Sequence, residues 1–183
     1  MGQWLSRFIL RLLGWSLLDL PARPARAVLV VYPHTSNWDF PLGVLFTAAV
    51  GLNVRWAGKD ALFRGPLGPY MRWLGGIAIN RREPAGIVER LAAALEREPF
   101  LLAITPEGTR SLRPGWKSGF YRIARKTGLP VLLATIDYGG RRIGLIDGFE
   151  LTGDEAADMA RIAAAYRDCR GRRPELASPI RFL

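Results

Sequence analysis

The sequence of 183 residues is poor in the residues that build metal centres and disulfides. It contains one cysteine, Cys169, and one histidine, His34. A lone cysteine cannot form a disulfide within the chain, and zinc ribbons and iron–sulfur clusters need several. A single histidine excludes the usual metal sites that need two. Any catalysis by histidine must therefore use His34.

The chain also lacks an apolar run that would cross a bilayer comfortably. The uncharged residues 40–54 would span about 23 Å as a helix, whereas a hydrocarbon core is about 30 Å thick. Hydrophobic residues make up 49% of the chain and charged residues 23%. This composition allows a sizeable core and excludes disorder as the main state. The length predicts a single domain, residues 1–183.

Positive charge is concentrated in two segments. The net charge is +10, and residues 55–82 contribute +5 and residues 113–142 contribute +6. If the two segments meet in the fold, they form a positive face for a phosphate-bearing ligand, an anionic membrane or an acidic carrier protein. The preference for arginine over lysine can equally reflect genomic base composition, so the charge alone does not decide the function.

The first 18 residues predict an amphipathic helix. Its apolar face carries Trp4, Leu5, Phe8, Ile9, Leu12 and Leu13. This pattern suits a helix that lies in the membrane interface over residues 1–20, with its arginines at the level of the headgroups. The alternatives are a helix packed on the protein's own core and a signal peptide. Arg11 interrupts the apolar region and argues against the signal peptide, and we favour the interface helix.

From residue 27 onward, strand patterns alternate with helix patterns. Strands are expected at 27–32, 53–57, 77–80, 100–105, 130–138 and 142–146. Helices are expected at 40–51, 66–74, 84–97 and 118–127, and a last helix begins near Thr152, which has capping-box spacing to Glu155. The alternation predicts an α/β fold with a largely parallel mixed sheet covered by helices. Residues 141–183, the carboxyl-terminal strand and helix, support no functional assignment.

The loop after the first predicted strand holds the only histidine. His34 follows the strand directly, and Asp39 comes five residues later, just before a helix. A turn of this length can place the carboxylate on one imidazole nitrogen, which fixes the tautomer and leaves the other nitrogen free as a general base. In the alternative interpretation, Asp39 caps the helix and His34 merely ends the strand.

Two further loops follow strands of the predicted sheet, where ligand sites of such folds lie. The loop after residues 100–105 contains Gly108, Thr109 and Arg110. The glycine allows a ligand to approach the backbone closely, the threonine supplies a hydroxyl donor, and the arginine can bind a phosphate with two hydrogen bonds. Arg81 follows the strand at 77–80. A tight turn with a surface ion pair is the plainer interpretation of the first loop.

Together these motifs resemble the four sequence blocks of the glycerolipid acyltransferase family. The blocks are the HxxxxD pattern from His34 to Asp39, GGIAINR at 75–81, PEGTRS at 106–111 and LPV at 129–131. HxxxxD alone is weak evidence, whereas its combination with Glu-Gly-Thr-Arg at this distance is specific. Over residues 27–140, the catalytic core, the chain is similar to bacterial 1-acylglycerol-3-phosphate acyltransferases and related lysophospholipid acyltransferases. The resemblance implies a fold like that of the glycerol-phosphate acyltransferases.

The resemblance also implies a role for each matching residue. His34 would be the base and Asp39 would orient it, and the acceptor site would comprise Arg81, Glu107, Gly108, Thr109 and Arg110, with Lys117 as a further phosphate contact. The reaction would move a fatty acyl group from acyl-CoA or acyl carrier protein to the free hydroxyl of a lysolipid, and it would require no metal and no bound cofactor. The expected acceptor is 1-acylglycerol-3-phosphate, giving phosphatidic acid, and a lyso-aminolipid is the alternative.

Two other classes of function fit the composition. A basic nucleic-acid-binding domain would use the charge, but no binding motif accompanies it, so we expect no nucleic-acid partner. A lipid-binding member of the fold without catalysis is opposed by the presence of both His34 and Asp39. We expect the membrane surface as a partner and a peripheral location on the cytoplasmic face of the bacterial inner membrane.

Overall fold

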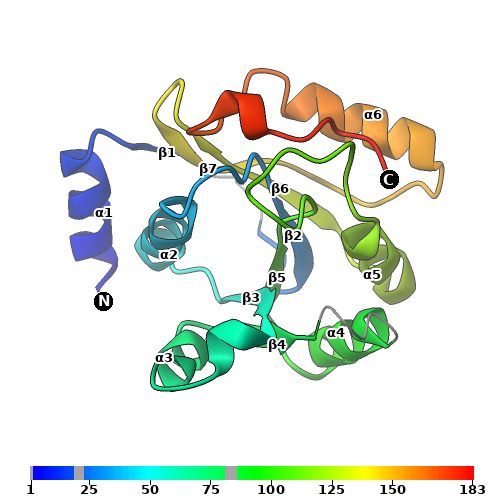
Figure 1. Ribbon diagram of the computed structural model, residues 1–183, viewed down its shortest axis with the longest axis horizontal. Coiled ribbons are helices and arrows are strands. Elements are labelled where there is room, and N and C mark those ends of the chain that lie inside the picture. The colour runs from blue at the N-terminus through cyan, green and yellow to red at the C-terminus, as the bar shows by residue number, and fades with distance from the viewer. Residues whose placement is uncertain (1, 19–22, 81–85) are drawn as a thin grey trace.

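A single sheet organises the computed structural model, which describes residues 2–18, 23–80 and 86–183. Seven strands of the described residues form it in the order β1-β7-β6-β2-β5-β3-β4 (Figure 1). They are β1 (Ser16–Leu18), β2 (Ala27–Val31), β3 (Val54–Lys59), β4 (Gly76–Ile79), β5 (Leu101–Ile104), β6 (Val131–Asp137) and β7 (Arg142–Phe149). All neighbours pair in parallel except β6 and β7. The predicted largely parallel mixed sheet is confirmed.

Helices cover both faces of the sheet, as Figure 1 shows. On one face lie α4 (Ile87–Arg97), α5 (Gly119–Thr127) and α6 (Glu155–Ala165), and on the other lie α1 (Gln3–Leu12) and α2 (Asp39–Val50). Within β2, Val28 and Val30 pack with the first set of helices, whereas Leu29 packs with the second. Because both faces are buried, this strand is apolar throughout, as its sequence predicted.

The element boundaries differ from the sequence expectation at both ends of the chain. The first helix ends at Leu12 because Gly14 adopts a left-handed conformation (φ 77), after which β1 pairs with β7. The last helix is capped by Asp154, whose carboxylate accepts hydrogen bonds from two backbone amides, and not by Thr152. The start expected for the helix at 84–97 lies outside the described residues.

The exposed side of α1 is its aromatic side. Ser6 and Leu10 are fully buried against the protein, and the Arg7 guanidinium donates to the carbonyl of Ala49 in α2 at 2.8 Å. The outer face carries Trp4, which is 76% exposed, together with Phe8 and Leu12. The helix thus packs on the protein through Ser6 and Leu10 and keeps an apolar outer face. In the described part of the chain, no helix has the length and apolarity needed to cross a membrane.

The sheet order determines which loops meet. Strands β6, β2 and β5 are neighbours and run in parallel, so their carboxyl ends lie at the same edge. Tyr138 follows β6, His34 follows β2 and Glu107 follows β5. The topology thus gathers three loops that are far apart in the sequence. The two basic segments do not lie side by side in the sheet, because β2 and β5 separate β6 from β3 and β4.

Candidate active site

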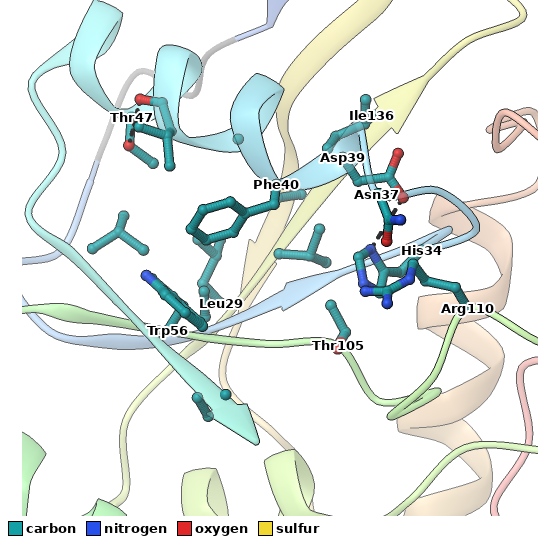
Figure 2. Close-up of a pocket in the computed structure, with 18 of the residues that line it drawn as sticks. Leu29, His34, Asn37, Asp39, Phe40, Thr47, Trp56, Thr105, Arg110 and Ile136 are labelled. Atoms are coloured by element: carbon teal, nitrogen blue, oxygen red, sulfur yellow. Dashed lines mark hydrogen bonds and ion pairs between the residues drawn. The ribbon is translucent and has the colours of Figure 1, made fainter. Parts of the chain in front are cut away.

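A cavity of about 650 Å³ opens at this edge of the sheet. One end is polar and is lined by His34, Asn37, Thr105, Thr109 and Arg110. The other end is mostly apolar and is lined by side chains of α2, β3 and the short helix α3 (Leu67–Trp73), among them Phe40, Val44, Trp56 and Met71. Figure 2 shows the polar group on one side and Phe40, Trp56 and Leu29 on the other. A ligand that fills the cavity therefore has a polar head and an apolar body.

His34 and Asp39 form a pair at the polar end. The His34 Nδ1 atom lies 3.1 Å from Asp39 Oδ2, and the histidine side chain is 16% exposed whereas the aspartate is buried. The spacing of the two residues predicted this contact, and the structure brings them together. With Nδ1 engaged by the carboxylate, Nε2 is the nitrogen available for proton transfer.

The Asp39 carboxylate also holds the loop that carries His34. Its Oδ2 atom accepts hydrogen bonds from the amides of Thr35 and Ser36, both at 3.0 Å, and its Oδ1 atom accepts one from the Tyr138 hydroxyl at 2.8 Å. The cap position of α2 is Trp38, which makes no side-chain cap bond. The alternative role of Asp39 as a simple helix cap is therefore wrong.

Tyr138 is a site residue that the sequence analysis missed. Burial raises the pKa of its phenol, and the hydrogen bond to Asp39 raises it further. The phenol therefore stays protonated and donates to Asp39 at neutral pH. Its ring also meets that of Trp15 edge-on, with centroids 5.1 Å apart. Tyr138 thus fixes the far side of the carboxylate that holds His34.

We expect Tyr138→Phe to lower kcat about threefold to tenfold, because one hydrogen bond to the orienting carboxylate is lost. KM should change little, since the hydroxyl points to Asp39. Steady-state kinetics measure this split, and Tyr121→Phe, which removes a hydroxyl bonded to the buried Asp158 carboxylate away from the cavity, is the matched control. An unchanged kcat in Tyr138→Phe would remove the residue from the positioning network.

Glu107 lies behind the loop that carries His34 and not on the cavity. It is buried, and its carboxylate accepts hydrogen bonds from the backbone amides of His34 at 2.7 Å and Ser178 at 2.9 Å. Burial raises its pKa, and the bonds from Ser178 and His34 oppose that shift. The role in the acceptor site expected from the resemblance does not match this position. The geometry makes Glu107 a positioning residue for the His34 backbone, because the loops after β2 and β5 are neighbours.

The other predicted binding residues differ in position. Gly108, at φ 65, lines the cavity with Thr109 and Arg110, and Arg110 lies beside His34 in Figure 2. Lys117 is exposed, and its aliphatic stem lies alongside Gly108 without lining the cavity. Arg81 lies outside the described residues. The structure therefore brings three of the predicted binding residues to the His34–Asp39 pair.

The carboxyl-terminal segment contributes to the site, although no motif in residues 141–183 predicted a function for it. The Ser178 amide bonds Glu107, and the Arg173 amide donates to Thr35 Oγ1 at 3.1 Å. The Arg172 guanidinium lies over the Trp38 ring, 5.7 Å from its centroid. The carboxyl-terminal segment therefore contacts and supports the loop from His34 to Asp39. Among the described residues, no three His, Cys, Asp or Glu side chains come together in a way that could hold a metal.

Comparison with known families and structures bears on this arrangement. The sequence matches the family described as Acyltransferase over residues 19–136. The chain belongs to the acyltransferase family. No curated protein gives a significant match. Among solved structures, this chain is similar to the crystal structure of PlsC, the 1-acyl-sn-glycerophosphate (LPA) acyltransferase of Thermotoga maritima. The two have a TM-score of 0.60 and 21% sequence identity, and the match covers 90% of this chain and 75% of the Thermotoga chain. That likeness shows a shared fold.

Proposed function

We propose that this acyltransferase moves a fatty acyl group from acyl-CoA or acyl carrier protein to the free hydroxyl of 1-acylglycerol-3-phosphate, giving phosphatidic acid. The observation that carries the proposal is the position of the His34–Asp39 pair, between Arg110 and the apolar part of the cavity. A lysolipid or an acyl thioester has the same order of parts, with an anionic group, a reacting centre and a long apolar chain. The activity named for the Thermotoga protein, which shares the fold, agrees with this acceptor.

The proposed chemistry uses only side chains and backbone of this chain. His34 Nε2 takes the proton of the acceptor hydroxyl as its oxygen attacks the thioester carbonyl. The negative charge of Asp39 stabilises the imidazolium, and donors of the Thr109–Arg110 loop hold the oxyanion. The carbon–sulfur bond then breaks, the imidazolium returns its proton to the thiolate, and the products are an ester and a thiol.

The acceptor's phosphate is proposed to bind Arg110, which has no carboxylate partner among the described residues. Arg110→Lys keeps the charge and loses the planar fork, so kcat/KM for lysophosphatidic acid should fall about tenfold. Arg110→Ala should cost about a hundredfold. The measurement is steady-state kinetics with both donors, on lysophosphatidic acid and on a phosphate-free lyso-aminolipid. Arg90→Ala, on the distant helix α4, is the control.

The two acceptors separate the proposal from its alternative. Losses confined to lysophosphatidic acid support a phosphate at Arg110. Equal losses on both acceptors would assign Arg110 to the donor or to the shape of the site, and the acceptor-phosphate assignment would be withdrawn. Turnover of the lyso-aminolipid alone would make that class of lipid the substrate.

We further propose that the protein is peripheral on the cytoplasmic face of the bacterial inner membrane, held by α1. The support is the exposed aromatic face of α1 and Arg11 in its last turn. Trp4→Ser combined with Phe8→Ser should weaken binding to anionic vesicles at least about tenfold, because the variant has no aromatic side chain at these positions to bury in the apolar phase of the bilayer. Activity on detergent-dispersed substrate should persist. Unchanged vesicle binding would refute the anchor.

The double substitution is preferable to deleting residues 1–18. The deletion would also remove β1 and the buried Trp15, both of which belong to the folded protein. Leu183→Ser, a change at an exposed apolar residue of the carboxyl terminus, is the matched control. Thermal unfolding of all variants should match the wild type, because each replaced side chain is exposed.

A further inference from the structure

A second apolar surface lies on the unit formed by the short helix η1 (Asp60–Phe63) and α3. Figure 1 shows this unit near β3 and β4, on the same side of the sheet as α2. Within residues 60–73, only Phe63 and Gly68 are buried. The exposed apolar side chains include Trp73, which is 74% exposed, and also Leu62, Leu67 and Tyr70. Large apolar side chains gathered on one short element mark an interaction site.

The inner side of the same unit closes the apolar end of the active-site cavity. Leu62, Met71 and Leu74 line that cavity. Leu62 is also 49% exposed, so the apolar interior reaches the surface at this residue. A second hollow of about 650 Å³ lies beside Tyr70 and Trp73 and shares the Leu74 wall with the first. The apolar surface is therefore continuous with the cavity that holds His34.

The charges around this surface are mainly positive. Four cations occur in residues 54–79, namely Arg55, Lys59, Arg64 and Arg72. The one acid of this stretch, Asp60, is paired with Arg64 at 2.6 Å, and Arg55 pairs with Glu98 of the neighbouring loop. The Arg72 guanidinium lies over the Phe63 ring, 5.8 Å from its centroid. Aromatic residues surrounded by cations complement an anionic lipid headgroup layer with an apolar phase beneath it.

We propose that the η1–α3 surface docks on an anionic bilayer and forms a second membrane contact in addition to that of α1. A single helix can hold the protein at a bilayer, whereas two contacts also fix its orientation and multiply its affinity. The orientation places the exposed edge of the cavity, at Leu62, against the lipid phase. The nature of the lipid that passes into the cavity rests on the proposed function, but the membrane contact does not.

The test compares Leu67→Ser combined with Trp73→Ser against the wild type and the Leu183→Ser control. We expect the double variant to bind phosphatidylcholine–phosphatidylglycerol vesicles at least about tenfold more weakly, because both side chains lose an apolar environment. Its thermal unfolding and its turnover of detergent-dispersed substrate should match the wild type. Lipids brominated in the acyl chain should quench the wild-type tryptophan fluorescence, and Trp73→Phe should remove part of that quenching.

The outcomes distinguish this proposal from its competitors. Unchanged vesicle binding and unchanged quenching in the Trp73 variants overturn it. Normal vesicle binding with a loss of turnover from acyl carrier protein, but not from acyl-CoA, also overturns it and assigns the surface to an acidic carrier. The vesicle measurements need no catalysis, so binding through Trp73 in a protein that acylates no lysolipid supports the docking surface and refutes the proposed function.

Discussion

Replacing His34 by alanine is expected to abolish acyl transfer and to leave the fold intact. General-base assistance contributes about 10²- to 10⁴-fold, and the chain has no second histidine to replace His34. The imidazole contacts the Asp39 carboxylate, whereas the backbone amide of His34 is bonded to Glu107 and stays in place. Turnover of lysophosphatidic acid with both donors measures the loss, and circular dichroism with thermal unfolding verifies the fold.

Asp39→Asn tests the carboxylate of the His34–Asp39 pair. The substitution removes the negative charge that stabilises the imidazolium, so turnover should fall strongly although less than in His34→Ala. The amide oxygen can still accept from Thr35 and Ser36, so the loop should keep its shape. The His34→Ala and Asp39→Asn changes together should cost little more than His34→Ala alone, because they act on one group. Near-normal turnover in folded His34→Ala would refute the mechanism.

The fold was predictable where one stretch of sequence carries the whole signal. Residues 27–32 are apolar without interruption, and they form the central strand β2, which is buried on both faces. The edge strand β1 was not predictable in this way. Its three residues continue the apolar pattern of the preceding helix, and they become a strand only because β7, more than a hundred residues later in the chain, offers a free edge.

In the site, too, contacts between residues close in the sequence were predicted, and contacts between distant residues were missed. The contact between His34 and Asp39 is local, so their spacing was sufficient to predict it. The bond from Tyr138 to Asp39 spans 99 residues and the bond from Ser178 to Glu107 spans 71. Both depend on which strand ends are neighbours in the sheet, and no short motif encodes this order. The resemblance located Glu107 correctly in the loop but could not show that its side chain turns away from the cavity.

Glu107→Ala should be the most destabilising single change at the site. It leaves the part-buried amide of His34 and the buried amide of Ser178 without an acceptor, and an unsatisfied buried donor costs roughly 1–3 kcal/mol. The loop carrying His34 would lose its fixed position, so kcat should fall together with the free energy of unfolding. Glu107→Gln retains one acceptor oxygen and should lie between Glu107→Ala and the wild type in both measurements.

The pH dependence of unfolding tests the buried state of the Glu107 carboxylate directly. Burial raises its pKa in the folded protein above the ordinary value of 4.5, so the folded state holds this proton more tightly than the unfolded state does. Relative to Glu107→Gln, the wild-type free energy of unfolding should therefore be greatest below pH 4.5 and should decline as the pH rises through the folded pKa. If Glu107 instead contacts the acceptor, Glu107→Gln will raise the KM for lysophosphatidic acid, and the two proteins will show the same pH dependence of unfolding. That result would restore the assignment of Glu107 to the acceptor site.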